Sequence, residues 1–147
     1  MTQKEKELKE LLLKDLSARL PYGIKAEIKY YDGVYKLQAI YTNGTTYATR
    51  DVEYPIETYF EDCKPYLFPM SSMTEEQKKE LCKVGGYEAR EEDCGYHSEI
   101  FYYNMVGNKN VFYPDADDID WLNKNHFDYR GLIEKGLAID ATGLNIY

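Results

Sequence analysis

No stretch of this sequence approaches the roughly 20 consecutive apolar residues that a membrane-spanning helix needs. The N-terminus, residues 1–7, carries too many Lys and Glu side chains for a secretion signal. Cysteine is scarce as well, because the chain has only Cys63, Cys82 and Cys94, which are odd in number and far apart. A secreted domain held by disulfides has an even number of cysteines at characteristic spacings. We therefore expect a cytoplasmic protein with reduced thiols and no membrane partner.

The sequence also lacks the motifs that identify the common enzyme classes. It contains no G-x-S-x-G elbow, no P-loop and no Rossmann glycine fingerprint. The cysteines could pair with His97 or His126 as nucleophile and base, but any chain with three Cys and two His offers such combinations. We expect a protein that is not an enzyme, and we assign no catalytic residue and no cofactor.

Zinc is the one metal that the residue types would suit. Cys94 and His97 have the C-x2-H spacing of a ligand pair, Cys82 could supply a third ligand and Cys63 a fourth. Structural zinc sites are usually built from two close pairs, and this sequence has one. The cysteines are better explained as small buried hydrophobic side chains. We expect no metal, and Cys82, Cys94 and His97 are weak candidates.

Chain length and charge restrict the organisation and the partners. At 147 residues the chain suffices for one sizeable core, so we expect a single domain over residues 1–147. The net charge of −8 is unevenly distributed: residues 1–50 carry nine Lys and Arg against six Asp and Glu, whereas residues 51–147 carry nine against twenty. An acidic second half repels phosphate backbones, so nucleic acid is not an expected partner unless the basic residues of the first half converge on one face.

Tyrosine is the most unusual component of the composition, with sixteen residues. Its large apolar ring and polar hydroxyl suit half-buried sheet faces and protein interfaces equally well. Tyrosines that cover a sheet would explain most of them, and a dedicated binding surface is the alternative.

The first half of the chain is patterned as a helix followed by strands. Leu side chains recur every three or four residues over residues 3–20, which predicts an amphipathic helix that Pro21 and Gly23 end. Apolar and charged residues then alternate over residues 24–30, as in a half-buried strand. Two further strands and two turns complete an antiparallel meander: strands over residues 34–41 and 45–49, and turns at Asp32–Gly33 and Asn43–Gly44.

The second half combines short helices with less regular segments. Thr74 and Gln77 match the S/T-x-x-E/Q capping box, which predicts a helix over residues 74–84. Acidic residues within 115–118 predict the start of another short helix, which reaches Trp121 and could extend to His126. The other expected segments are a weak edge strand, a proline-containing extended segment, a loop, a hairpin and a final apolar stretch, over residues 52–60, 64–70, 87–99, 100–113 and 132–139. The predicted fold class is α+β, with an N-terminal amphipathic helix, an antiparallel meander of three or more strands, and two or more further short helices packed on the sheet.

The densest group of polar and aromatic residues lies within residues 121–131. The candidates there for binding a ligand or a partner are Trp121, Asn125, His126, Tyr129 and Arg130. A helix that continued to His126 would allow His126 to approach Asn123 and Arg130. The alternative is a packed corner in which Trp121 and Phe127 are buried. We prefer the packed corner.

Two segments carry a resemblance to a known group of proteins. They are KPYLFPMSSMTEEQ, residues 64–77, and DWLNKNHFDYRGLIEKGLAID, residues 120–140, which together make up about a quarter of the chain. With the N-terminal helix and strand meander around them, they resemble short proteins encoded by gut Bacteroides genomes, their prophages and related phages. The resemblance brings no activity, cofactor or site residue with it. It implies a mobile-element accessory protein that works in the host cytoplasm.

Three functions are consistent with these observations. The preferred one is a small non-enzymatic module that binds a protein partner, or associates with itself, through a tyrosine-rich surface. An alternative is an acidic inhibitor of a host nuclease or defence protein, which requires the carboxylates of the second half to gather on one face. The third is a small-ligand binder or enzyme that uses His126, Tyr129 and Arg130, which would have to line a concave pocket.

Overall fold

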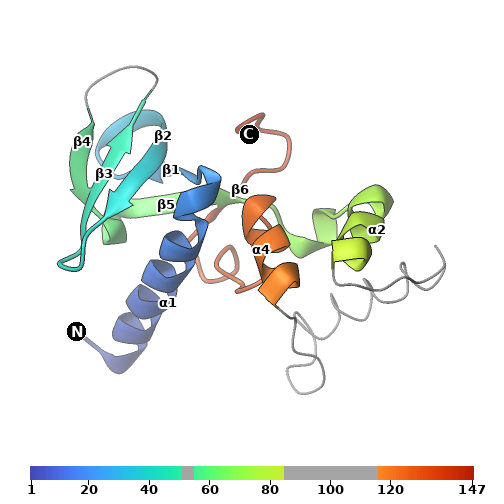
Figure 1. The fold of residues 1–147 in the computed structure, drawn as a ribbon. Helices are drawn as coiled ribbons and strands as arrows, with labels where there is room; N and C mark the ends of the chain where they lie inside the picture. The colour runs from blue at the N-terminus through green and yellow to red at the C-terminus, as the bar shows by residue number, and fades with distance from the viewer. Residues whose placement is uncertain (51–54, 85–115) are drawn as a thin grey trace. The chain divides into compact units, whose positions relative to one another are not determined.

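The computed structural model describes residues 1–50, 55–84 and 116–147, and it confirms the expected α+β fold class (Figure 1). The chain divides into two compact units. Residues 1–67 and 132–147 form the first, which we call the sheet unit, and residues 68–131 form the second, which we call the helical unit. Each unit has a hydrophobic core of its own, and the single domain expected from the chain length stays a prediction.

The sheet unit begins with helix α1, Gln3–Arg19, which confirms the predicted amphipathic helix. Thr2 caps it: the Thr2 hydroxyl accepts a hydrogen bond from the Glu5 N–H at 3.1 Å, and the Glu5 carboxylate accepts one from the Thr2 N–H at 2.9 Å. A 3-10 turn over Leu20–Tyr22 follows the helix. Gly23 then adopts a left-handed conformation at φ 72°, which glycine tolerates without strain and which directs the chain into the sheet.

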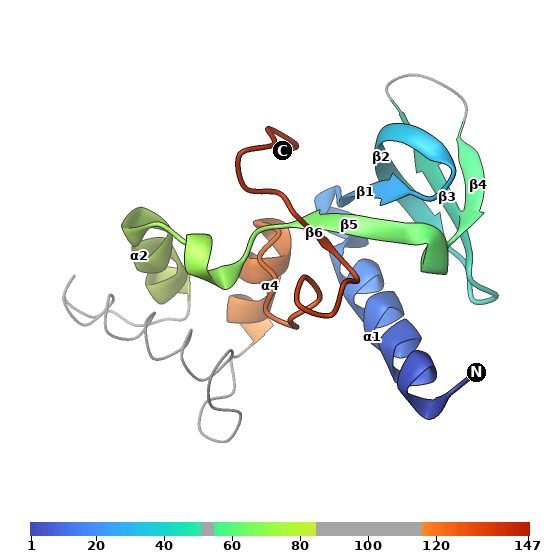
Figure 2. The same ribbon diagram turned by 180° about the vertical axis from the view of Figure 1, so that it is seen from behind.

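Among the described residues, the sheet has six strands in the order β4-β3-β2-β1-β5-β6. All neighbouring pairs are antiparallel except β5 and β6, which run parallel. The bounds are β1 Lys25–Ile28, β2 Tyr31–Ile40, β3 Thr45–Thr49, β4 Ile56–Tyr59, β5 Cys63–Leu67 and β6 Ile139–Asp140. The predicted three-stranded meander corresponds to β1, β2 and β3, and the turn at Asn43–Gly44 between β2 and β3 is confirmed. Figure 2 shows β5 lying between β1 and the short β6.

The first turn of the meander differs from the prediction. The turn between β1 and β2 lies at Lys29–Tyr30, with Ile28 opposite Tyr31, and Asp32–Gly33 lies inside β2. The predicted hairpin turn at Asp32–Gly33 is therefore wrong. Gly33 has a φ of 101° and lies where the register of the two strands shifts, so it serves a bulge. Asp-Gly suits a bulge as well as a tight turn, because both need a residue with positive φ.

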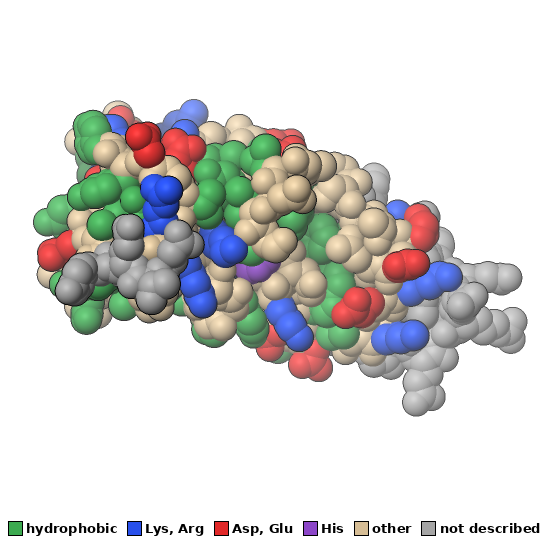
Figure 3. Space-filling view, turned by 90° about the horizontal axis from the view of Figure 1, so that it is seen from above, with side chains coloured by type: hydrophobic (Ala, Val, Ile, Leu, Met, Phe, Trp, Pro, Cys, Tyr) green, Lys and Arg blue, Asp and Glu red, His purple; other side chains and the backbone are tan. Residues whose placement is uncertain are grey.

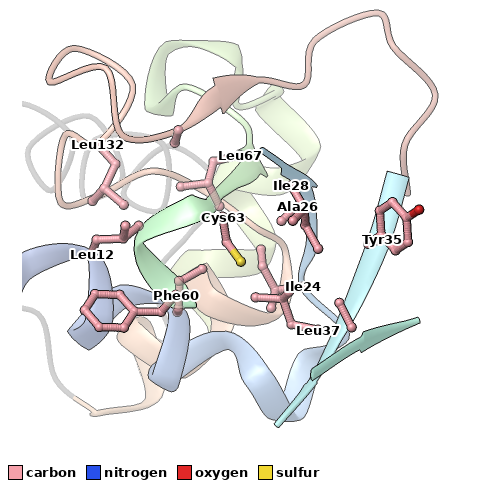
Figure 4. Packing of buried hydrophobic residues seen from close by; sticks show 13 residues of the cluster. Leu12, Ile24, Ala26, Ile28, Tyr35, Leu37, Phe60, Cys63, Leu67 and Leu132 are labelled. Atoms are coloured by element: carbon pink, nitrogen blue, oxygen red, sulfur yellow. The ribbon is translucent and has the colours of Figure 1, made fainter. Parts of the chain in front are cut away.

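Helix α1 packs on one face of the sheet. Leu12 of the helix belongs to the same core cluster as the inward-facing side chains of β1, β2, β3 and β5 (Figure 4). Burial alternates along β1, where Ala26 and Ile28 are buried whereas Lys25 and Glu27 are not. The buried set faces α1, and we call the opposite side of the sheet the outer face.

One ion pair lies within this core. The Arg19 Nε donates a hydrogen bond to the Asp15 Oδ2 at 3.0 Å, one helical turn away, and both side chains are fully buried. A charge in such a place depends on its partner, because an isolated buried charge is strongly disfavoured. Each member of the pair therefore depends on the other to be tolerated in the core.

The helical unit contains α2, Glu75–Val84, and α4, Ala116–Lys124, which pack against each other. The predicted capping box of α2 is confirmed: the Thr74 hydroxyl accepts from the Gln77 N–H at 3.1 Å, and the Gln77 side chain accepts from the Thr74 N–H at 2.9 Å. The buried core of the unit is rich in aromatic and Met side chains, namely Met70, Met73, Leu81, Trp121, Leu122, Phe127 and Tyr129. The loop and hairpin expected over residues 87–113 lie outside the described residues.

Candidate functional site

Three of the five residues proposed from the sequence as a ligand or partner site are buried. Trp121, His126 and Tyr129 are 6%, 8% and 7% exposed, and Asn125 and Arg130 are partly buried. The Asn125 Nδ2 donates to the Trp121 carbonyl at 2.9 Å. The Arg130 guanidinium lies 4.5 Å from the centre of the Tyr129 ring, as in a cation–π contact. The structure thus gathers these residues, but largely inside the helical unit.

Their contacts are those of a packed corner. The rings of Trp121 and Phe127 are stacked with centroids 5.7 Å apart, and the Trp121 indole N–H donates to the Glu80 carboxylate at 3.2 Å. The Tyr129 hydroxyl donates to the Asn123 Oδ1 at 2.8 Å. Buried aromatic rings whose polar ends are hydrogen-bonded stabilise a fold without needing a ligand. The predicted burial of Trp121 and Phe127 is confirmed.

His126 lies beyond the end of α4 rather than within it. The helix ends at Lys124, so a helix continuing through His126 is excluded. The His126 N–H donates to the Asn123 carbonyl at 3.2 Å, and the Phe127 N–H donates to the Leu122 carbonyl at 2.9 Å. These two bonds make a Schellman motif, in which the residue at the left-handed position is usually glycine. His126 holds that position with a φ of 62°, so its backbone is strained.

Cys63 of β5 does not have the properties of a nucleophile or a metal ligand. It is fully buried, and burial together with the nearby Asp62 carboxylate raises the pKa of its thiol to about 12. Among the described residues, no group of three or more His, Cys, Asp or Glu side chains is placed to hold a metal ion. Cys94 and His97 lie outside the described residues, and the side chain of Cys82 is not described, so the weak zinc candidates stay untested.

The outer face of the sheet unit carries a pocket of about 550 Å³. Its volume falls within the range of small-molecule sites, roughly 300–1,000 Å³. Strands β1, β2 and β3 contribute one part of the lining and the C-terminal segment contributes the other. The lining residues are Lys25, Val34, Lys36, Gln38, Thr49, Leu144, Asn145 and Ile146.

Two lysines from neighbouring strands line this pocket. Lys25 is directly opposite Lys36 in the register of β1 and β2, and like charges at such positions destabilise a sheet. The Lys25 Nζ donates to the Ile146 carbonyl at 2.8 Å and lies 5.7 Å from the centre of the Tyr147 ring. Among the residues that the structure describes, no carboxylate forms an ion pair with either lysine. The pocket therefore holds two lysines that have no ion-pair partner among the described residues.

The C-terminal segment is attached to the sheet by the hydroxyl of Tyr147. This hydroxyl accepts a hydrogen bond from the Lys25 N–H at 3.0 Å and donates one to the Tyr66 carbonyl at 2.8 Å. It joins β1 to β5 next to Pro65, which lies opposite Ala26 and has no N–H to donate. The residue is 42% exposed as a whole, but its hydroxyl is enclosed between the strands, and burial raises the pKa of Tyr147 well above its usual value.

A group of tyrosines lies on the outer face beyond the pocket, and we call it the tyrosine surface: Tyr41, Tyr47 and Tyr59. The rings of Tyr41 and Tyr47 meet edge to face with centroids 5.5 Å apart. Tyr59 of β4 is opposite Thr45, and thus diagonal to Tyr47 across β3 and β4. Tyr41 and Tyr59 are 55% and 57% exposed. Tyr35 and Tyr66, by contrast, are buried in the sheet, as expected for tyrosines that cover a sheet, whereas a dedicated binding surface stays a prediction.

Acidic side chains do not form one continuous surface on the face shown in Figure 3. Red groups there are separated by basic, polar and hydrophobic side chains. Among the described helices, none has the length and hydrophobicity that a transmembrane segment requires.

The sequence contained part of the signal for these sites. Alternation over residues 24–30 places Lys25 on the polar face of a strand, but nothing in the local pattern indicates that residues 144–146 lie beside it. The Asp15–Arg19 pair and the Thr2–Glu5 capping box have i,i+4 and i,i+3 spacings that can be seen in the sequence.

A scan against protein-family models gives no match to this chain, and searches of curated proteins and of solved structures find none either.

Proposed function

We propose that this chain is a non-enzymatic protein-binding module that contacts its partner through the tyrosine surface. The observation that carries the proposal is the exposure of Tyr41 and Tyr59 beside a third tyrosine on one sheet face. Tyrosine supplies a large contact area with few rotatable bonds, and it is enriched among the residues that dominate interface energies. A partner that covers these rings would bury apolar area at a small cost in side-chain entropy.

The position of the tyrosine surface in the sheet supports this use. Strand β4 is at one end of the strand order, so Tyr59 belongs to an edge strand. Tyr47 pairs with Glu57 in register, and the charge of that carboxylate, followed by burial, raises the pKa of the Tyr47 hydroxyl. The hydroxyl therefore stays protonated at neutral pH. The surface offers a partner three aromatic rings and a carboxylate at a strand edge.

The chemistry of the described residues supports a non-enzymatic role. Cys63 is a buried thiol whose raised pKa keeps it protonated, and His126 is 8% exposed. A nucleophile or a general base must reach its substrate and hold a suitable protonation state. The proposal of a ligand site or enzyme based on His126, Tyr129 and Arg130 has less support, because two of these side chains are buried in the packed corner.

The test is affinity capture of the tagged full chain from a lysate of the host cell, followed by mass spectrometry. The variant Tyr41→Ser/Tyr59→Ser removes the two exposed rings. The matched control is Tyr30→Asn, which removes an 87% exposed tyrosine at the other end of β2, where asparagine tolerates the φ of 74°. We expect a protein that the wild type and Tyr30→Asn retain and that the double variant loses. A protein retained equally by all three would refute the proposal, as would capture of no protein.

The salt dependence of capture distinguishes the proposed function from its alternative. The resemblance to Bacteroides and phage proteins supports a mobile-element accessory protein acting in the cytoplasm, and such proteins meet host enzymes. An acidic inhibitor of a host nuclease or defence protein is the alternative proposal, and the net charge of −8 supports it. Its binding would weaken steeply between low and high salt, whereas binding through tyrosine rings would change little.

A further inference from the structure

We propose that the pocket lined by Lys25 and Lys36 binds a small organic phosphate. The two lysines lie directly opposite each other on β1 and β2, and no carboxylate of the described residues pairs with them. Two cationic side chains opposite each other on one sheet face raise the energy of the empty protein, and a dianion bound between them reverses the sign of that interaction. A phosphate monoester carries a charge close to −2 at neutral pH and therefore matches the pair.

The polar lining of the pocket is rich in donors. The Gln38 Nε2 donates to the Thr49 Oγ1 at 2.8 Å, so the Thr49 hydroxyl hydrogen is left to point elsewhere. Gln38 keeps a second N–H, and each lysine has N–H groups beyond those already used. Ionised phosphate oxygens accept hydrogen bonds and donate none, so this set of donors suits phosphate better than a cation or a neutral sugar.

One carboxylate of β1 shares the sheet face of Lys25 but is opposite a different lysine in register. Glu27 follows Lys25 by two residues on the same face, but its register partner is Lys64 of β5. Glu27 therefore has a lysine directly opposite it on the β5 side of β1. The Lys25–Lys36 side has no such compensation, although Lys25 is held in place by the Ile146 carbonyl.

The remaining walls define the rest of the ligand. Val34, Leu144 and Ile146 are apolar members of the lining. A phosphate held by the lysines would place the group esterified to it against these side chains, which favours an apolar or aromatic group over a second charge. The proposed ligand class is thus a monophosphate ester of a small, partly apolar molecule. This site shares no residue with the tyrosine surface, and the two proposals can fail separately.

The test measures binding of phenyl phosphate to the full chain by isothermal titration calorimetry. Lys36→Gln is the informative variant, because Lys36 is exposed and its removal leaves the core unchanged. Lys64→Gln is the matched control, since Lys64 is also an exposed strand lysine but pairs with Glu27 outside the pocket. We expect Lys36→Gln to weaken binding roughly tenfold or more and Lys64→Gln to weaken it less than about twofold. Phenol, which lacks the phosphate, should bind far more weakly than phenyl phosphate.

Thermal unfolding gives a second readout. Phenyl phosphate should raise the melting temperature of the wild type and not that of Lys36→Gln. Without ligand, Lys36→Gln should melt at or above the wild-type temperature, because the variant relieves the repulsion between the two lysines. Absence of phenyl phosphate binding to the wild type at up to about 10 mM would overturn the proposal. An equal loss of affinity in Lys36→Gln and Lys64→Gln would overturn it as well, because it would show diffuse attraction rather than a site.

Discussion

The bridge made by Tyr147 leads to a sharp prediction for Tyr147→Phe. The substitution keeps the ring, and with it the contact to the Lys25 ammonium, and removes only the hydroxyl. The Lys25 N–H then loses its acceptor at 3.0 Å and the Tyr66 carbonyl loses its donor at 2.8 Å. Pro65, which precedes Tyr66 in β5 and lies opposite Ala26, has no N–H to add to the pairing of the two strands there.

The expected loss of unfolding free energy is about 1–3 kcal/mol, the usual cost of leaving a buried backbone group without its hydrogen bond. For a chain of this size, each kcal/mol lowers the melting temperature by about 2–4 °C. Urea unfolding measures the free energy, and hydrogen exchange of the Lys25 amide measures the local effect. That amide should exchange roughly tenfold faster for each 1.4 kcal/mol lost.

The control is Tyr30→Phe, which removes a hydroxyl from the most exposed tyrosine described. Its unfolding free energy should stay within about 0.5 kcal/mol of the wild type. If Tyr147→Phe changed the free energy by no more than this control, with an unchanged Lys25 exchange rate, the hydroxyl would not be linking the two strands. The explanation of how the C-terminal segment is attached would then be refuted.

Three further perturbations test other parts of the structure. His126→Gly should cost less stability than His126→Ala by about 1 kcal/mol, because glycine adopts the φ of 62° without strain and alanine does not. Urea unfolding of both variants measures the difference. Equal free energies of unfolding would contradict the Schellman assignment. Asp15→Asn should destabilise the chain by about 3–5 kcal/mol, because it leaves Arg19 charged and buried. The double variant Asp15→Leu/Arg19→Met should recover most of that loss in urea unfolding. A double variant as unstable as the single one would show that the pair is not the cause. The thiol of Cys63 should resist alkylation in the native state at pH 9 and react in urea. Since folding raises the pKa of the thiol from 9.0 to about 12, the free energy of unfolding should fall as pH rises through that interval. Fast alkylation of the native protein at pH 9 would contradict the raised pKa.

Local patterns predicted the described helices well. The leucine repeat predicted α1, and the Thr74–Gln77 capping box predicted the start of α2, because both signals involve residues within one or two helical turns. The predicted hairpin turn at Asp32–Gly33 was wrong, because Lys29–Tyr30 forms the turn, with Tyr30 at a φ of 74°. Nothing in a Lys-Tyr pair indicates that conformation, whereas Asp-Gly favours it.

The candidate site required contacts that no local pattern contains. Lys25 and Lys36 are brought together by strand register, which the wrong turn position would have shifted. Leu144 and Ile146 complete the pocket from the opposite end of the sequence. Conversely, the polar and aromatic segment around His126 attracted attention because of its composition. These residues instead form the C-terminal end of helix α4 and part of a buried core, where their polar groups hydrogen-bond to one another.

The parallel pairing of β5 with β6 has a consequence for synthesis on the ribosome. Translation delivers α1 and β1 to β5 first, and all of residues 68–131 must follow before β6 and Tyr147 emerge. Until then β5 presents an unpaired edge, including the Leu67 carbonyl that later accepts from the Ala141 N–H. The nascent sheet unit therefore stays incomplete throughout the making of the helical unit, and a ribosome that stalls within residues 68–131 would hold a chain with an open, adhesive strand edge.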